Sequence, residues 1–171
     1  DGMGGANSGD RAAHMVIRSV ADQAANAQEK DRLRTNILDA IERANLEILS
    51  WGIGAGATLV VALLVEDTAR IFHVGDAEAI ICSNRGRIKF STVAHTPVAM
   101  AVEIGVLGEQ EAMLHEHRNI VNNHVGSREM RIEIGPPVSM GLHDTLLLGS
   151  DGLFDNLMLS EIVHVVRGNE L

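Results

Sequence analysis

The spacing of apolar residues changes once along this chain, and that change limits the folds open to it. Between residues 10 and 49, apolar side chains recur every three or four positions, which predicts two amphipathic helices. Residues 57–65 are instead apolar and β-branched in a continuous run, which predicts a buried strand. Further short strand patterns follow, without helices between them. Helices first, strands next and a helix last predict an α+β layered domain and not alternating βαβ units.

The predicted elements are separated by clear turn signals. Helices are expected at residues 10–24, 31–49, 96–117 and 160–166, the third broken near residues 105–108. Strands are expected at residues 57–65, 70–74, 79–83, 87–90, 128–134 and 145–148, the first four forming an antiparallel meander. Residues 1–9 are rich in glycine and asparagine and are expected to form no regular element.

Composition argues against a nucleic-acid partner. The chain has 171 residues, enough for one domain with a sizeable core, and its formal net charge is −9. No basic patch that would hold a phosphate backbone is visible in the sequence. Aromatic side chains on which bases stack are scarce, with three Phe, one Trp and no Tyr.

The sequence predicts a cytoplasmic protein without a membrane partner. The longest apolar run, residues 57–65, is too short to span a bilayer, and no signal peptide is visible. Cys82 is the only cysteine, so no disulfide can form within the chain, and it is expected to be a small buried side chain.

Three aspartates lie beside glycines at expected turns or strand ends. They are Asp1, followed by Gly2; Asp76, preceded by Gly75; and Asp151, followed by Gly152. An aspartate at the end of a strand is exposed at the rim of a sheet while its backbone stays rigid. Carboxylate and backbone oxygens are the ligands that hard divalent cations prefer. The pattern indicates a metal site, although one Asp-Gly pair alone is more often a turn.

Six short segments, taken in order, carry a resemblance to a known family. They are Asp1-Gly2-Met3-Gly4-Gly5, Gly56-Ala57-Thr58, His73-Val74-Gly75-Asp76-Ala77, His95-Thr96-Pro97, His117-Arg118-Asn119 and Ser150-Asp151-Gly152-Leu153-Phe154-Asp155. Together they resemble the signatures of the type 2C, or PPM, metal-dependent protein phosphatases in their bacterial branch. The resemblance covers nearly the whole chain, and six segments in order are far more specific than any one.

The resemblance implies an α-β-β-α layered sandwich of two antiparallel sheets flanked by helices. It also implies a centre of two or three manganese or magnesium ions. By position, Asp1 would bridge two metals, Gly2 would offer its carbonyl, and Asp151 would bind one of the same metals. Asp76, with Asp151, would hold a third. The expected catalytic residues are therefore Asp1 and Asp151. The implied reaction is hydrolysis of phosphoserine and phosphothreonine in proteins by a metal-activated water.

The resemblance also implies a single catalytic domain over residues 1–171, with a flap at residues 96–126. This polar, histidine-rich stretch lies between predicted strands, where insertions tend to carry function. The expected partners are phosphorylated proteins, the substrates of a Ser/Thr kinase.

The chain departs from the family pattern in several places. The pattern places a strand with another metal-binding carboxylate and a phosphate-binding arginine before Asp1, and an Asp-Asn motif after the last helix, so the sequence is expected to be cut short at both ends. Ala77-Glu78 replaces Ser-Arg, which is expected to change packing and not chemistry. Met3 replaces a histidine that serves some relatives as general acid, so bound water would take that role.

Other interpretations remain open at this point. One is a non-catalytic pseudophosphatase or phosphoprotein-binding module, and another is a small-molecule phosphatase on the same fold. A zinc site at His115, His117 and His124 is disfavoured because no cysteine supports it. His73 is expected to be a satisfied core histidine, and Asp155 either caps a helix or supports the site.

Overall fold

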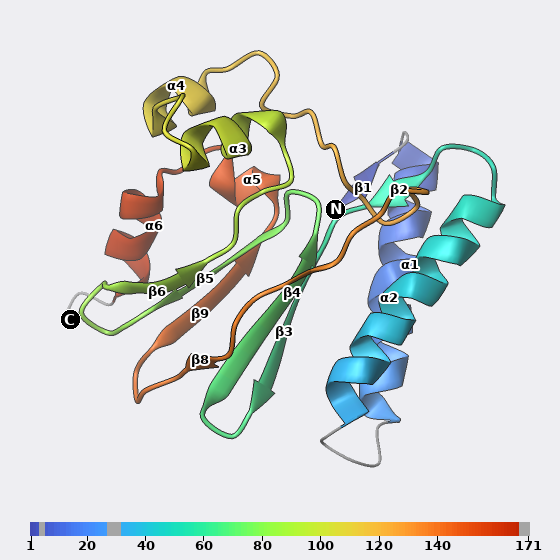
Figure 1. Cartoon of the computed structure of the whole chain (residues 1–171), viewed down its shortest axis with the longest axis horizontal. Coiled ribbons are helices and arrows are strands. Elements are labelled where there is room, and N and C mark those ends of the chain that lie inside the picture. Colours follow the sequence, from blue (N-terminus) through green and yellow to red (C-terminus); the bar gives the residue numbers. More distant parts are fainter. Residues whose placement is uncertain (4–5, 27–31, 168–171) are drawn as a thin grey trace.

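The fold is α+β with antiparallel sheets, as the sequence predicts. The computed structural model describes residues 1–3, 6–26 and 32–167 (Figure 1). The helices are α1 (Ala6–Ala25), α2 (Leu33–Ser50), α3 (Pro97–Glu103), α4 (Glu109–Met113), α5 (Asp151–Phe154) and α6 (Leu159–Val166). The strands are β1 (Gly2–Met3), β2 (Gly56–Ala57), β3 (Leu59–Val65), β4 (Thr68–Val74), β5 (Glu78–Cys82), β6 (Ile88–Ser91), β7 (Glu133–Ile134), β8 (Val138–Ser139) and β9 (Thr145–Gly149).

Helices α1 and α2 form a pair that covers one face of the first sheet (Figure 1). Their apolar stripes converge on one core, in which Val16 and Ile41 are almost fully buried. The hydroxyl of Ser19 donates to the carbonyl of Ala40 at 3.0 Å and links the two helices directly. The helical periodicity read from residues 10–49 therefore corresponds to burial against a sheet.

Two antiparallel sheets pack beneath these helices. The first has the order β3-β4-β7, with β8 pairing with another part of β4, and the second has the order β6-β5-β9. Side chains alternate along β4, so Phe72 contacts the α1–α2 core while Ile71 contacts Ile81 of the second sheet. Helices α5 and α6 lie beside the second sheet, away from α1 and α2 (Figure 1).

The prediction of one continuous buried strand over residues 57–65 is wrong. β2 pairs with β1, whereas β3 pairs with β4 in a different sheet. Thr58 lies between them, and its N–H donates to the carbonyl of Asp1 at 2.9 Å. The strand is also only partly buried, since the side chain of Leu64 is 54% exposed. Apolar runs do not reveal which partner each residue pairs with, and that partner changes at Thr58.

The predicted meander is likewise interrupted between β4 and β5. These strands follow one another in sequence but belong to different sheets. The chain crosses between the sheets at Gly75, whose φ of +97° is a left-handed conformation that favours glycine. Asp76 follows at once. The corner between the two sheets therefore carries one of the predicted metal ligands.

The first residues are more regular than expected. Gly2 and Met3 form β1, and α1 begins at Ala6, within the stretch predicted to be irregular. A Cβ on Gly2 would come within 2.2 Å of the backbone of Gly9 in α1. The glycines that made this segment look irregular instead let a strand and a helix approach closely.

Several shorter elements also differ from the expectation. Of the strand predicted at residues 128–134, only Glu133–Ile134 forms, and the pattern missed β8 and α5 entirely. The helix over residues 96–117 is divided into α3 and α4 near Gly105, as predicted. Thr96 caps α3 by accepting from the N–H of Ala99 at 3.0 Å, and Pro97 follows in the first turn.

Within residues 1–3, 6–26 and 32–167, none of the helices combines the length and the apolar character needed to cross a membrane.

Replacing Ile41 by alanine should test the assigned face of α2. Ile41 is fully buried between the helices and the first sheet, so Ile41→Ala should lower the free energy of unfolding by about 2–5 kcal/mol. Leu46 lies on the same helix with 67% of its surface exposed, and Leu46→Ala should change it by no more than about 0.5 kcal/mol. Urea denaturation measures both, and equal losses would contradict the assignment.

Candidate metal centre

Carboxylates from separate segments meet at the corner between the two sheets. Asp76 follows β4, Glu78 begins β5, and Asp151 and Asp155 begin and end the short helix α5. Asp76 is close enough to Asp151 and Asp155 for their charges to act on its ionisation. Two segments separated widely in sequence, residues 76–78 and 151–155, therefore place acidic side chains in one region, here called the acidic cluster (Asp76, Glu78, Asp151 and Asp155).

Burial and mutual repulsion make ionisation costly in this cluster. Burial, followed by the charge of Asp151, raises the pKa of Asp76, whose side chain is almost fully buried. Burial raises the pKa of Glu78 to about 8, and the carboxylates of Asp76 and Asp155 add to the effect. Burial and Asp151 also raise the pKa of Asp155. These raised pKa values reflect in part the repulsion between neighbouring carboxylates, and a bound cation would relieve that repulsion.

Asp1 and Gly2 lie at the edge of the same region. The side chain of Thr58 lies against Gly75, directly before Asp76, and the backbone of Thr58 is hydrogen-bonded to Asp1. The carbonyl of Asp1 accepts the N–H of Thr58, and Gly2 pairs with Ala57. The structure thus brings Asp1, Asp76 and Asp151 to one side of the molecule. Gly4 and Gly5 of the first signature lie outside the described residues.

Arg118 connects the acidic cluster to the segment at residues 96–126. Its Nε lies 3.5 Å from a carboxylate oxygen of Asp155, and its Nη1 donates to the carbonyl of Met113 at 3.1 Å. The guanidinium therefore offsets part of the rise in the pKa of Asp155. Asp155 is the C-cap residue of α5, where its N–H donates to the carbonyl of Asp151 at 2.8 Å, while its side chain contacts Arg118. Both the helix-capping and the site-supporting alternatives are therefore compatible with its position.

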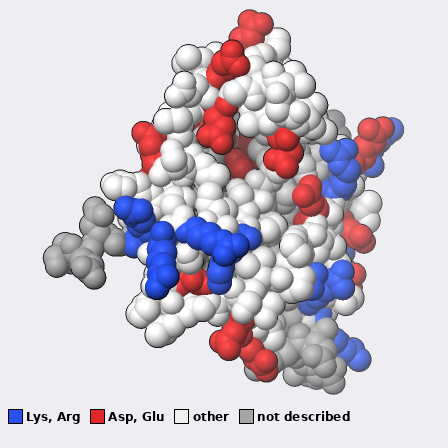
Figure 2. Space-filling view, turned by 60° about the vertical axis from the view of Figure 1, so that its left-hand side comes forward, with Lys and Arg blue, Asp and Glu red and all other residues white. Residues whose placement is uncertain are grey.

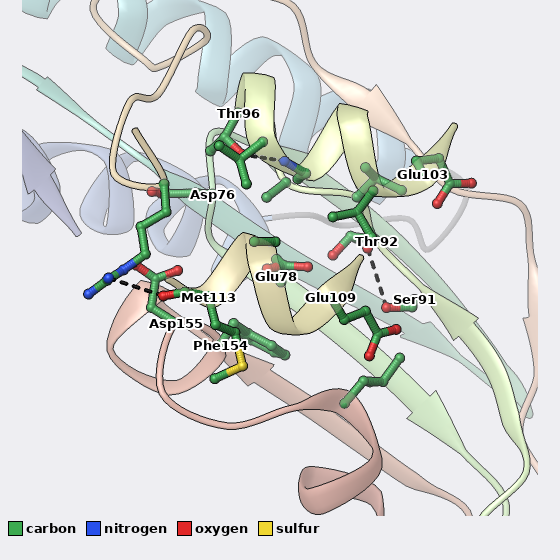
Figure 3. A pocket seen from close by; sticks show the side chains of 18 of the residues that line it. Asp76, Glu78, Ser91, Thr92, Thr96, Glu103, Glu109, Met113, Phe154 and Asp155 are labelled. Atoms are coloured by element: carbon green, nitrogen blue, oxygen red, sulfur yellow. Dashed lines mark hydrogen bonds and ion pairs between the residues drawn. The ribbon is translucent and has the colours of Figure 1, made fainter. Parts of the chain in front are cut away.

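A cavity of about 360 Å³ opens beside the acidic cluster, under α3 and α4. Figure 3 shows Asp76 and Asp155 at one side of it and Glu103 and Glu109 at the other, with Phe154 along its wall. Apolar residues of α3, α4 and the α5–α6 segment line most of the space between. Figure 2 shows acidic side chains around a recess on this face, while basic side chains gather elsewhere on it.

The donor set of the acidic cluster suits a hard divalent cation. Carboxylate oxygens in this number are what Mg²⁺, Mn²⁺ and Ca²⁺ bind, and no thiolate is near to favour a softer metal. Cys82 is buried, as predicted, at the other end of β5. The residues present therefore fit the metal chemistry that the sequence suggests.

A second group of potential ligands is occupied by hydrogen bonds. His73, His95 and Glu133 hold ligand atoms within 4.8 Å of one another. His73 Nε2 lies 3.1 Å from the carbonyl of Val93, and a carbonyl can only accept, so this nitrogen carries a proton. His73 is the satisfied core histidine that the sequence predicts. The ring of His95 is similarly occupied, as described below, so this group makes a poorer metal site than the acidic cluster.

Glu78 is the member of the acidic cluster that sequence reasoning missed. From the sequence, the pair Ala77-Glu78 is expected to change packing and not chemistry, and no metal-binding role is predicted for Glu78. Glu78 opens β5 two residues after Asp76, and this closeness in sequence to a predicted metal ligand is the signal from which it could be found. The structure shows this carboxylate lining the cavity beside Asp155 (Figure 3).

Comparison with known proteins identifies the family. The model of the protein phosphatase 2C family matches residues 5–101. The chain belongs to the protein phosphatase 2C family. A serine/threonine phosphatase named stp from Listeria monocytogenes is 28% identical over 177 aligned residues, which cover 98% of this chain and 69% of the relative.

Solved structures give the same fold. The serine/threonine phosphatase of S. agalactiae superimposes with a TM-score of 0.87 at 28% identity, covering 100% of this chain and 73% of that one. The catalytic domain of the serine/threonine phosphatase PstP, solved in complex with two manganese ions, gives a TM-score of 0.81 at 25% identity and covers 99% and 73%. The resemblance inferred from six short segments is confirmed at the level of family and fold.

The pH dependence of stability should report Glu78 in protein stripped of metal by EDTA. Its pKa is raised from 4.5 to about 8 in the folded chain, so the folded state holds this proton more tightly than the unfolded state. The resulting stabilisation is complete below pH 4.5 and is lost as the pH rises through about 8. Glu78→Gln should flatten this part of the curve, a difference on the order of a few kcal/mol.

Urea denaturation at intervals between pH 5 and pH 9 would measure the effect. Glu47→Gln, at an exposed position on α2, is the matched control and should follow the wild-type curve. A Glu78→Gln curve that is parallel to the wild-type curve across this range would show that the carboxylate is not held as described.

Proposed function

We propose that this chain is the catalytic core of a metal-dependent phosphatase that hydrolyses phosphoserine and phosphothreonine in proteins. The observation that carries the proposal is the meeting of Asp76, Asp151 and the first residue at one corner of a protein phosphatase 2C fold. Relatives at 28% identity are named serine/threonine phosphatases, which supports the substrate class. The metal is proposed to be manganese or magnesium, in two or three ions, since a related catalytic domain was solved with two manganese ions.

Each of the proposed ligands has a distinct place. Asp1 would hold cations through its carboxylate, Gly2 through its carbonyl, and Asp151 through its carboxylate. Asp76 and Asp151 together would hold another. Bound cations would supply a water of lowered pKa and neutralise the oxygens of the phosphate.

The surrounding residues of the chain would orient the substrate and limit the access of water. Arg118, held by Asp155 and the carbonyl of Met113, offers a positive charge beside the cluster that can attract a phosphate. The apolar wall of the cavity, including Phe154 and Met113, would cover the side of the phosphorylated residue. Met3 has no exchangeable proton, so the leaving oxygen would take its proton from water.

The segment at residues 96–126 is proposed to act as a flap that tunes substrate choice. It contributes α3, α4 and Arg118 to the cavity, and several large apolar side chains on it are exposed, including Ile104, Val106 and Leu114. Exposed apolar side chains next to a cavity are typical of a surface that contacts another protein.

A non-catalytic, phosphoprotein-binding role is the competing proposal. Glu78 favours a non-catalytic role, because this partly buried side chain stands beside the proposed metal ligands where the family pattern has an arginine. The two functions separate in one experiment, since a binding module would retain phosphopeptides without turning them over, whatever metal is added.

Asp151→Asn should abolish manganese-dependent hydrolysis of para-nitrophenyl phosphate. Removing one charged ligand weakens metal binding on the order of a hundredfold, because hard cations depend on the number of charged oxygens. The circular dichroism spectrum should remain nearly unchanged. Asp39→Asn, at an exposed position on α2, is the control and should hydrolyse at the wild-type rate. Wild-type turnover by the Asp151 variant would overturn the assignment.

Hydrogen exchange should distinguish the flap from the sheets. Amides of residues 98–120 should exchange at least about tenfold faster than those of β4 and β5, because few of their side chains are fully buried. Mass spectrometry after brief deuterium labelling measures this directly. Protection equal to that of the core strands would mean that the segment is a fixed wall and not a flap.

A further inference from the structure

We propose that His95 is a positioning residue for the metal centre, because it fixes the Gly75 peptide and thereby the direction in which Asp76 leaves β4. This inference rests on the proposed function only in assigning Asp76 to metal. Among the residues that the structure describes, His95 makes no hydrogen bond to a member of the acidic cluster, so it would act on the metal through the backbone of Gly75.

Both backbone polar groups of Gly75 are bonded to His95. The N–H of His95 donates to the carbonyl of Gly75 at 2.9 Å, and the N–H of Gly75 donates to Nδ1 of the His95 ring at 3.0 Å. Gly75 has a φ of +97°, and a Cβ there would come within 2.6 Å of the Thr58 side chain. The conformation and the space therefore fit only glycine, and a single residue, His95, hydrogen-bonds both of its backbone polar groups.

The hydrogen bonds around the ring define its tautomer. Nδ1 receives two donors, the N–H of Gly75 at 3.0 Å and Nδ2 of Asn123 at 2.8 Å, so it must be unprotonated. The proton then sits on Nε2, which donates to a carboxylate oxygen of Glu133 at 3.1 Å. The side chain is 8% exposed, and stacking on His73 at a centroid distance of 4.4 Å fixes its plane.

This arrangement also explains why His73, His95 and Glu133 make a poorer metal site than the acidic cluster. A cation on Nε2 of His95 would need the proton to move to Nδ1, where two N–H groups already point. Both nitrogens of the ring are committed, one as acceptor and one as donor. The group is better understood as support for the neighbouring turn, in the way that outer residues orient the ligands of a metal.

The same residue joins the two ends of the proposed flap. His95 directly precedes residues 96–126, and its carbonyl accepts the N–H of Asn122 at 3.0 Å. Asn123 is in turn held by both backbone groups of Arg131, at 2.8 and 3.0 Å. The base of the flap and the turn that carries Asp76 therefore share one buried hydrogen-bonded unit.

Two isosteric variants separate the roles of the ring nitrogens. The side-chain oxygen of asparagine occupies the place of Nδ1, so His95→Asn keeps an acceptor for the N–H of Gly75. Glutamine reaches instead to the place of Nε2, so His95→Gln keeps only the contact with Glu133. We expect His95→Asn to bind manganese within about threefold of wild type, and His95→Gln to bind it about tenfold more weakly, a difference of about 1.4 kcal/mol.

A double-mutant cycle with Asp76→Asn tests whether the effect passes through Asp76. Manganese affinity is measured by electron paramagnetic resonance for wild type, His95→Gln, Asp76→Asn and the double variant. If His95 acts by aiming Asp76, His95→Gln should have no further effect once Asp76 is replaced. Additive losses, or equal losses in the asparagine and glutamine variants, would overturn the proposal.

Measurements on metal-free protein keep the test independent of the proposed function. Nitrogen-15 shifts of the His95 ring should show an unprotonated Nδ1, and the amide of Gly75 should exchange faster in His95→Gln than in His95→Asn. If wild type binds no manganese, the proposed function fails, and the exchange rates then decide whether His95 holds the turn. Equal exchange at Gly75 in both variants would reject the role of His95 whatever the metal result.

Discussion

The fold must hold several carboxylates close together in a partly buried region, although burial and mutual repulsion oppose this. Burial, and then repulsion from neighbouring carboxylates, raises the pKa of Asp76, Glu78 and Asp155, and in solution such groups would move apart. They stay together because each leaves a backbone that is fixed for other reasons, by a sheet corner, a strand or a short helix. The packing of two sheets under a helix pair thus stabilises an arrangement of charge that is unfavourable by itself, which is how a protein prepares a cation site.

The corner between the sheets is where fold and chemistry meet. A chain that stayed in one sheet after β4 would carry Asp76 on to a neighbouring strand; the turn at Gly75 sends it across to the second sheet instead. α5 follows β9, the strand that pairs with β5, so Asp151 arrives at the same rim through ordinary antiparallel register, with Glu78 opposite Gly149. Arg118 then supplies a compensating charge from the segment above.

Predictions from the sequence were correct where the signal is local and does not depend on distant parts of the chain. Helical spacing located α1 and α2, and Asp-Gly pairs in order located the family, because these signals are local. It failed where the structure of a segment depends on its distant partners. The apolar run over residues 57–65 is divided at Thr58 between two sheets, and Gly2 and Gly9 let a strand and a helix approach closely where an irregular segment was expected. The role of His95 was equally invisible, since a histidine before a helix carries no sign of the glycine that it will contact 20 residues earlier.

The closed base of the segment at residues 96–126 has a consequence for how such a chain can vary. Because the carbonyl of His95 and the N–H of Asn122 meet, and Gly126 is tied to Asn45 of α2 at 2.6 Å, the two ends of the segment are fixed independently of what lies between them. The entropy lost on closing a loop grows only with the logarithm of its length, about 0.6 kcal/mol for each doubling. Insertions and deletions between these two ends would therefore leave the sheets and the acidic cluster almost undisturbed. The same pair of sheets can thus support segments of different length and conformation over the cavity.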